Sequence, residues 1–237
     1  MELIGCTREQ VKLGYRAVLC SNDMRAAEIL TLNSLMLIHA WKYPVFRNIL
    51  ETAEKYSVDS TGIRIAERLV NKRKTDKYPG IEMAEDIISE GYPVFFWGGR
   101  PGVAKRAADE LMSKYPAADI RGFNDGYFSA GNEDSIIAEI NKSGADVLFI
   151  GLAMPAQQEL AGRIKKAVKV KLIVGVGGSF DVFSRDVKRA PGFFIFTGTE
   201  WLWRTMQEPA RLMRLLPLPY FILILVWRTF RKKGLLD

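Results

Sequence analysis

The chain has 237 residues, 48% of them hydrophobic and 26% charged, which suits one globular domain and excludes a disordered chain or an assembly of many domains. Its 34 basic and 27 acidic side chains give a formal net charge of +7, which favours an anionic partner such as a phosphate group, a nucleic acid or a lipid headgroup. With one histidine, His39, and two cysteines, Cys6 and Cys20, a zinc site would have to rely on carboxylates, and no disulfide framework is expected. No cationic and apolar leader opens the chain, so we expect a reduced, cytoplasmic protein.

The first part of the chain combines short apolar runs with amphipathic segments. Thr7 and Gln10 have the spacing of a capping box, which predicts that a helix starts at Thr7. The expected elements are, in order, a strand at 2–4, the helix from Thr7, a strand at 28–32, helices at 34–42 and 44–55, and a basic amphipathic helix from Ile63 to about Lys72. A polar loop is expected between the last two helices.

The middle of the chain alternates apolar, β-rich runs with helical segments. The expected strands lie at 94–97, 119–122, 145–152 and 171–176, and the expected helices at 101–115, 132–143 and 156–168. Strands that alternate with helices are joined by right-handed crossovers, which makes the sheet parallel and covers both of its faces. We therefore predict an α/β fold, in which residues 1–205 form a single Rossmann-like domain with a mainly parallel sheet and helices on both faces.

The remaining part, 206–237, is predicted to be a basic, membrane-associating appendage. Residues 201–237 hold seven basic and two acidic side chains, and they enclose an uncharged run at 215–227. A spanning helix needs about 20 apolar residues, so this run is too short to cross a bilayer, and Pro217 and Pro219 are expected to break any helix there. The side chains expected at the membrane are Leu215, Leu216, Leu218, Tyr220, Phe221, Trp227, Arg228 and Arg231. The alternative is a buried C-terminal helix with a solvated basic end.

Three glycine-bearing turns follow expected strands, at 98–102, 151–158 and 175–181. Ligands of parallel sheets bind at the carboxyl ends of the strands, and glycine lets backbone N–H groups approach a phosphate closely. None of the turns has the spacing of a dinucleotide-binding fingerprint or a P-loop, which argues against a dehydrogenase and a P-loop enzyme. Ordinary tight turns remain the alternative to a phosphate site.

Polar residues near these turns are candidates for chemistry. No two aspartates are spaced D-x-D, so a bound diphosphate would be neutralised by cations such as Lys188 and Arg189, which could equally be a solvated surface pair. Asp59 lies in the polar loop and is either a general base or a helix N-cap. Thr31 and Asn33 follow an apolar run and either present polar groups at a strand end or form a turn and a helix cap.

Taken in order, these pieces resemble the WecG/TagA/CpsF family of bacterial glycosyltransferases from about residue 27 to the basic tail. The most specific segment, 175–214, is similar to the family elements GVGGxFD, KRAP, EWxxR and EPxR in their order and spacing. Further blocks that resemble the family are those at 97–116, 126–128 and 154–157, the T-P-N element at 31–33 and the D-G-x-G loop at 59–62. The chain departs from the family pattern at Leu32, Ser60, Lys77 and 158–160.

The resemblance implies an inverting, metal-independent enzyme without a cofactor. It would transfer a hexose or an N-acetylhexosamine, such as N-acetylmannosamine or glucose, from a UDP-sugar to a sugar on a polyprenyl diphosphate. This would take place on the inner face of the cell membrane, with its anionic surface, during synthesis of a cell-surface polysaccharide or teichoic acid. No nucleic acid is implied, and the chain could act alone or as a homo-oligomer. The alternatives are a Rossmann-like oxidoreductase and a basic nucleic-acid-binding protein, neither of which explains an apolar run inside the most basic segment.

The resemblance also assigns roles to residues. Asp59 would be the general base, and Thr31 and Asn33 would position the acceptor or the base. The nucleotide-sugar would be bound by Gly98, Gly99, Gln157, Gly175, Gly177, Gly178, Ser179 and Asp181. The diphosphate groups of donor and acceptor would be met by Lys77, Lys188, Arg189, Arg204, Arg211 and Arg214.

Overall fold

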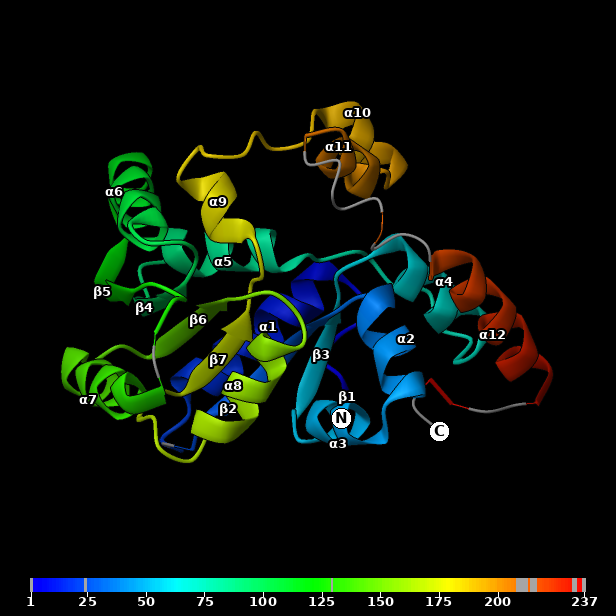
Figure 1. The fold of residues 1–237 in the computed structure, drawn as a ribbon, viewed down its shortest axis with the longest axis horizontal. Coiled ribbons are helices and arrows are strands. Elements are labelled where there is room, and N and C mark those ends of the chain that lie inside the picture. Colours follow the sequence, from blue (N-terminus) through cyan, green and yellow to red (C-terminus); the bar gives the residue numbers. More distant parts are fainter. Residues whose placement is uncertain are drawn as a thin grey trace.

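A computed structural model describes residues 2–23, 25–128, 130–207, 213, 217–231 and 234–235. These residues form an α/β fold around one seven-stranded sheet in which every pairing is parallel (Figure 1). The sheet has the order β1-β3-β2-β7-β6-β4-β5. Its strands are β1 (Glu2–Leu3), β2 (Ala27–Leu32), β3 (Lys55–Val58), β4 (Pro93–Gly98), β5 (Asp119–Asn124), β6 (Val147–Gly151) and β7 (Leu172–Gly175). The predicted fold class is confirmed.

Helices connect the strands and cover both faces of the sheet (Figure 1). Their bounds in the first half are α1 (Arg8–Cys20), α2 (Ser34–Lys42), α3 (Pro44–Glu51), α4 (Thr61–Leu69), α5 (Gly80–Ser89) and α6 (Val103–Lys114). In the second half they are η1 (Ala130–Asn132), α7 (Glu133–Ser143), α8 (Ala156–Ile164), α9 (Ser179–Phe183), α10 (Gly192–Thr197), α11 (Glu200–Gln207) and α12 (Leu218–Arg231). The capping box predicted at Thr7 is present, since Thr7 and Gln10 exchange hydrogen bonds at the start of α1.

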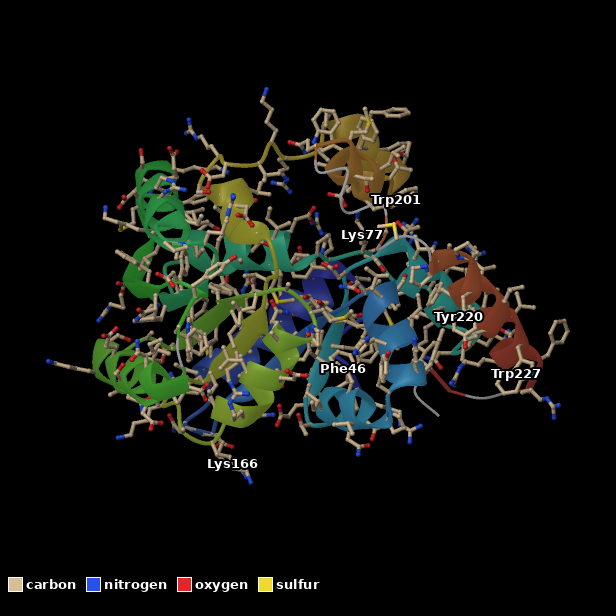
Figure 2. The ribbon with its side chains drawn as sticks, viewed as in Figure 1. Phe46, Lys77, Lys166, Trp201, Tyr220 and Trp227 are labelled. Atoms are coloured by element: carbon tan, nitrogen blue, oxygen red, sulfur yellow. The ribbon has the colours of Figure 1, made fainter. Side chains whose placement is uncertain are left out.

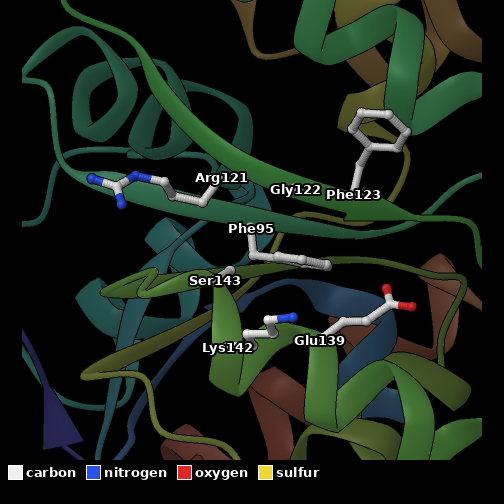
Figure 3. A pocket seen from close by; sticks show the side chains of 7 residues that line it. All are labelled: Phe95, Arg121, Gly122, Phe123, Glu139, Lys142 and Ser143. Carbon is white, nitrogen blue, oxygen red and sulfur yellow. The ribbon is translucent and has the colours of Figure 1, made fainter.

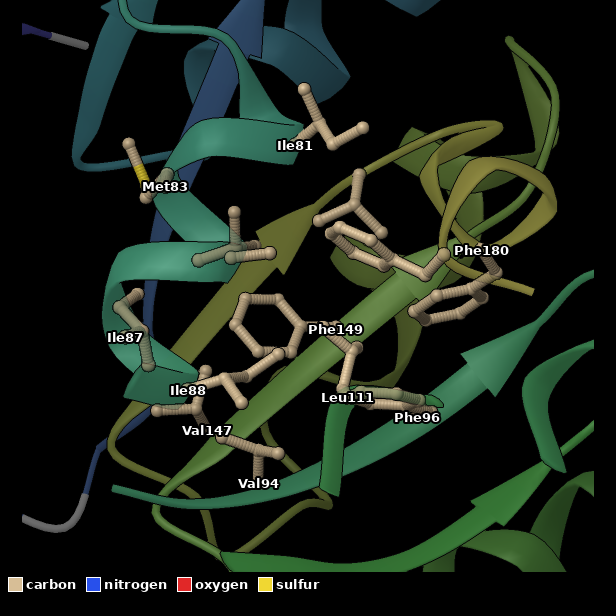
Figure 4. Packing of buried hydrophobic residues seen from close by; sticks show 14 of the residues in the cluster. Ile81, Met83, Ile87, Ile88, Val94, Phe96, Leu111, Val147, Phe149 and Phe180 are labelled. Carbon is tan, nitrogen blue, oxygen red and sulfur yellow. The ribbon is translucent and has the colours of Figure 1, made fainter. Parts of the chain in front are cut away.

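The core follows from the two-residue period of the strands. In β6, Val147 and Phe149 face a layer formed by α1, α5, α6 and α9, as Figure 4 shows for part of that cluster. The intervening Leu148 and Ile150 face α7 and α8 on the other side. Every residue of β6 is therefore buried, and this is why the strand is a continuous apolar run in the sequence.

Two elements differ from the sequence-based expectations. Residues 55–58, expected at the end of a helix and in the loop after it, form β3, which pairs with both β1 and β2. Helix α5 was not expected, although Ile81, Ala84 and Ile88 follow one helical face and are buried. β3 acquires its conformation from its strand partners, because it is only four residues long, whereas α5 has local signals in Pro79 at its start and in the helical spacing of its buried residues.

The C-terminal helix α12 also corrects an expectation. The prolines do not prevent it, because Pro217 precedes the helix and Pro219 lies in its first turn, where a missing N–H breaks no helical hydrogen bond. Its side chains Phe221 and Arg228, expected at a membrane, are instead buried. The ring of Phe221 stacks on Trp41 of α2 with a centroid distance of 5.6 Å.

The inner side of α12 thus belongs to a core cluster shared with α2, α3 and α4. The guanidinium of Arg228 lies 4.8 Å from the Trp41 ring centroid, and Trp41 Nε1 donates to the Leu235 carbonyl at 2.8 Å. Phe221 also approaches α4, since a Cβ atom on Gly62 would lie 3.2 Å from its ring. Within the described part of the chain, no helix combines the length and the apolar character needed to span a membrane.

Candidate active site

The ends of three neighbouring strands meet at the residues predicted to be catalytic. Thr31, in β2, donates its hydroxyl to the carbonyl of Gly175 at the end of β7, with an oxygen–oxygen distance of 2.7 Å. Asp59 follows β3, and its Oδ1 accepts a hydrogen bond of 3.1 Å from the backbone N–H of Gly80. Because Gly80 is the first residue of α5, the carboxylate of Asp59 lies at the positive end of that helix. This hydrogen bond fixes the orientation of the carboxylate that is predicted to be the general base.

Little space separates the start of α5 from the ends of β2 and β7. A Cβ atom on Gly80 would lie 3.0 Å from Thr31 Cγ2 and 3.2 Å from the Gly175 carbonyl oxygen. A side chain at this position would therefore push α5 away from β2 and β7. The glycine lets the start of α5 reach Asp59.

The helix-cap alternatives for Asp59 and Asn33 have different outcomes. Ser60, and not Asp59, is the N-cap of α4, whereas the carboxylate of Asp59 accepts the first backbone N–H of α5. Asn33 is the N-cap of α2, and its Oδ1 accepts from Met36 N at 3.1 Å. The two capped helices meet where the hydroxyls of Ser34 and Ser60 lie 3.3 Å apart. Asn33 is thereby fixed beside the loop that carries Asp59.

The predicted nucleotide residues lie at the carboxyl ends of the adjacent strands. Gln157, at the start of α8, accepts a hydrogen bond of 2.7 Å from Gly177 N through its Oε1. A Cβ atom on Gly175 would collide with the amide group of Gln157, so a side chain at this position would displace Gln157 from the turn. Gly178 and Ser179 continue the same turn into α9, and the Ser179 hydroxyl donates to the Val176 carbonyl at 2.6 Å.

The β4 turn completes this edge of the sheet. Gly98 and Gly99 have φ angles of 148° and 75°, and Gly98 packs against the Gly151 backbone at the end of β6. The guanidinium of Arg100 lies 3.6 Å from the carboxylate of Asp181. The structure therefore brings the predicted glycine turns and Gln157 to the same edge as Asp59 and Thr31, as expected for the carboxyl ends of parallel strands.

Lys77 lies on the segment before α5 and has an ion-pair partner. The backbone N–H of Tyr78 donates to the Val58 carbonyl at 2.7 Å, which holds the segment before α5 along the end of β3. From there the ammonium group of Lys77 forms an ion pair with Glu200, the first residue of α11.

The other predicted cations differ in their surroundings. Arg189 pairs with Glu85 at 3.0 Å and with Glu82 at 3.5 Å on α5, so it is not a freely solvated side chain. The backbone of Lys188 is bound to α11, because its carbonyl accepts hydrogen bonds from Trp203 and Gln207. The remaining expected residues, for which the structure describes no side chain, are Arg204, Arg211, Arg214, Leu215 and Leu216.

The family model that matches this chain is described as the glycosyl transferase WecG/TagA/CpsF family, and the match covers residues 7–234. The chain belongs to this family. The match begins earlier than the resemblance drawn from motifs, at the start of α1.

Two curated relatives of this glycosyltransferase have the name N-acetylglucosaminyldiphosphoundecaprenol N-acetyl-beta-D-mannosaminyltransferase. The relative from Bacillus spizizenii is 29% identical over 202 residues, which cover 84% of this chain and 78% of that protein. The relative from Bacillus subtilis is 28% identical over 211 residues, which cover 87% of this chain and 82% of that protein.

Sequence reasoning missed two residues that contact the candidate site residues of this glycosyltransferase. Gly80 follows Pro79, a dipeptide that indicates a turn, yet nothing local shows that its amide meets Asp59. Glu200 belongs to the E-W-x-x-R element, but its partner Lys77 is far away in the sequence. Such contacts depend on the fold as a whole.

A hollow of about 360 Å³ lies away from this edge (Figure 3). It is lined by Phe95, Arg121, Gly122, Phe123, Glu139, Lys142 and Ser143. These residues come from β4, β5 and α7 and include none of the predicted site residues. Among the residues whose structure is described, no three His, Cys, Asp or Glu side chains are grouped so that they could hold a metal ion.

Proposed function

We propose that this glycosyltransferase transfers a sugar from a UDP-sugar to a sugar carried on a polyprenyl diphosphate, with inversion at the anomeric carbon. The observation that carries the proposal is the position of Asp59, at the start of α5 and beside the ends of β2 and β7. The names of the two relatives favour N-acetylmannosamine as the transferred sugar and an N-acetylglucosamine-bearing lipid diphosphate as the acceptor.

A single displacement accounts for inversion. The carboxylate of Asp59 accepts the proton of the acceptor hydroxyl, and the hydroxyl oxygen attacks the anomeric carbon. The bond from that carbon to the UDP oxygen breaks, and its electron pair leaves with the diphosphate. Thr31 and Asn33 support this step by fixing the strand end and the helix start on either side of Asp59.

The departing UDP needs compensation for its negative charge. The turn at 175–179 offers backbone N–H groups without obstructing side chains, and Gln157 holds that turn in place. Lys77, on the segment before α5, supplies a cation that is now paired with Glu200. We propose that these groups take the role that a divalent metal has in other sugar-nucleotide enzymes, since the sequence has no D-x-D pair.

The outer side of α12 supports a position on the membrane. Its exposed large apolar residues have exposed fractions of 44% to 84% and are Tyr220, Ile222, Leu223, Val226, Trp227 and Phe230. Figure 2 shows the Trp227 side chain pointing away from the body of the molecule. A helix with one buried side and one apolar exposed side suits binding in the plane of a bilayer surface, with Arg231 near the headgroups. We propose that the protein is peripheral to the inner face of the cell membrane, where a lipid-linked acceptor is available.

The test is a transfer assay with a panel of UDP-sugars and a polyprenyl-diphosphate-linked N-acetylglucosamine acceptor. We expect release of UDP that depends on the acceptor, is fastest with UDP-N-acetylmannosamine and yields a product of inverted anomeric configuration. Release of UDP that is independent of the acceptor, or transfer with retained configuration, would contradict the proposal.

A further inference from the structure

The ion pair between Lys77 and Glu200 joins two parts of the molecule that are otherwise loosely connected. Helices α10 and α11 form a hairpin, residues 192–207, that lies apart from the main sheet in Figure 1. No residue of α10 is buried, so the hairpin has little apolar packing to hold it. The paired side chains of Lys77 and Glu200 are only 13% and 25% exposed, which makes their contact one of the better-shielded polar links to the body.

A second contact places the hairpin over the catalytic loop. The hydroxyl of Thr61 donates to the carbonyl of Gly198, in the hairpin turn, at 3.4 Å. A Cβ atom on Gly198 would lie 2.3 Å from that hydroxyl, so the turn rests directly on the start of α4. Thr61 is two residues after Asp59. The hairpin turn therefore lies beside the proposed base.

We infer that Glu200 is a positioning residue. Its carboxylate binds the ammonium group of Lys77 in place of a substrate diphosphate and thereby holds the hairpin against the body of the molecule. This inference rests on the proposed function, in which Lys77 meets the diphosphate of the donor. The backbone beside Lys77 is fixed by the bond between Tyr78 and Val58, so Glu200 is the partner that moves. A half-buried ammonium group requires a counter-charge, and a diphosphate supplies more negative charge than one carboxylate.

The hairpin can move as a unit when Glu200 is displaced. Within it, the rings of Phe194 and Trp203 lie 5.3 Å apart, and Thr199 N donates to the Phe194 carbonyl at 2.9 Å. The segment that joins α9 to the hairpin, residues 184–191, stays attached to α5 through the ion pairs of Arg189. Binding of a diphosphate at Lys77 therefore releases one contact of the hairpin while the tether remains.

The experiment combines UDP binding with hydrogen exchange of the 192–203 amides in the full-length protein. Without ligand, Glu200→Gln should increase exchange of these amides to the level that the wild type reaches only with UDP. The variant should also bind UDP about 5-fold more tightly, because the carboxylate of residue 200 no longer competes with UDP for Lys77. This factor is typical of the free energy of one partly shielded ion pair. Glu133→Gln, which removes a carboxylate from the ion pair with Arg163 elsewhere, is the matched control and should change neither quantity.

A charge-swapped variant, Lys77→Glu with Glu200→Lys, separates the role of the ion pair in holding the hairpin from the role of Lys77 in binding a diphosphate. It should restore slow exchange in the hairpin, but UDP should no longer accelerate it. If Glu200→Gln leaves both UDP affinity and hairpin exchange unchanged, the inference is wrong. A wild-type protein that binds no UDP would contradict the proposed function itself, whereas one that binds UDP without any change in hairpin exchange would contradict only the inference.

Discussion

At the scale of single residues, the site depends on the contact between Asp59 and the start of α5. The amide of Gly80 keeps the Asp59 carboxylate in place. An amide side chain at position 59 can still accept this hydrogen bond through its oxygen, but it cannot take up a proton from the acceptor. The contribution of the base to catalysis can therefore be measured separately from its contribution to the fold.

We expect Asp59→Asn to lower kcat by about 10²- to 10⁴-fold, the usual contribution of a general base, with little change in UDP affinity or thermal stability. Steady-state kinetics, calorimetry and thermal unfolding check these quantities. Asp76→Asn, which changes an exposed carboxylate on the segment before α5, is the control and should retain activity. An Asp59→Asn enzyme with near-normal turnover per folded molecule would show that another group is the base.

Gly80→Ala tests the narrow packing at the same place. The added methyl group would lie 3.0 Å from Thr31 Cγ2 and 3.2 Å from a backbone oxygen, so α5 has to shift away from the strand ends. We expect a loss of stability of about 1–3 kcal/mol, typical of overpacking, together with reduced kcat. Gly131→Ala is the control because a Cβ atom there would have no neighbour within 4 Å. Unchanged melting temperature and turnover in Gly80→Ala would contradict the argument.

Glu28 is expected to make the stability of the fold depend on pH, independently of catalysis. It is buried at the amino end of β2, and burial raises the pKa of its carboxyl group to about 7, with Lys165 opposing and Glu54 adding to the shift. Because the folded pKa lies above the ordinary value, the protonated form favours folding. The resulting stability is fully present below about pH 4.5 and is lost as the pH rises towards 7.

Glu28→Gln keeps the shape of the side chain and removes its charge. We expect the variant to be more stable than the wild type at pH 8, by up to about 3 kcal/mol, and similar to it at pH 4.5. Denaturant unfolding at the two pH values measures the difference. A stability gain of equal size at both values would mean that packing, and not ionisation, is responsible.

At the scale of elements, strands buried on both faces were predictable and strands that depend on neighbours were not. The apolar runs of β4, β6 and β7 stand out in the sequence because all of their residues except Pro93 are buried. β3 has the sequence Lys55-Tyr56-Ser57-Val58, and its conformation depends on parallel partners on both sides. That the glycine turns and the candidate site residues lie at one edge of the sheet was predictable from the order of strands and turns. The contacts of Asp59 with Gly80 and of Lys77 with Glu200 were not, since they join distant segments.

Helix α12 presents a matched pair of leucines on opposite sides. Leu225 is 2% exposed and Leu223 is 69% exposed. We expect Leu225→Ala to lower the free energy of unfolding by about 2–5 kcal/mol, because it removes a fully buried side chain. Leu223→Ala should leave unfolding unchanged and weaken sedimentation with anionic liposomes. If both variants behave alike in both assays, the two sides of α12 do not have separate roles.

At the scale of the whole molecule, the division of the chain at residue 206 remains a proposal, since α12 shares a core with α2, α3 and α4. Removal of everything after residue 205 would expose Trp41 and the inner side of that core. The overall excess of basic side chains is consistent with the two proposed substrates, each of which carries one diphosphate group, and with an anionic surface.

The same charge balance leads to a prediction about metal ions. If cations and backbone amides neutralise the leaving UDP, transfer to a lipid acceptor should continue in excess EDTA at close to its normal rate. The acceptor-dependent release of UDP, with and without EDTA, measures this. Complete loss of activity that Mn²⁺ or Mg²⁺ restores would show that a metal takes part.

The packing of Phe221 against Gly62 has a consequence for how the enzyme finds its acceptor. Gly62 is three residues after Asp59, so the helix proposed to lie on the bilayer packs directly against the helix start that follows the proposed base. A protein held on the bilayer by α12 searches for its lipid-borne acceptor by diffusion in two dimensions instead of three. Each encounter then presents the acceptor sugar from the same side and at the same height, and part of the orientational entropy of the reaction is already lost before the substrates meet.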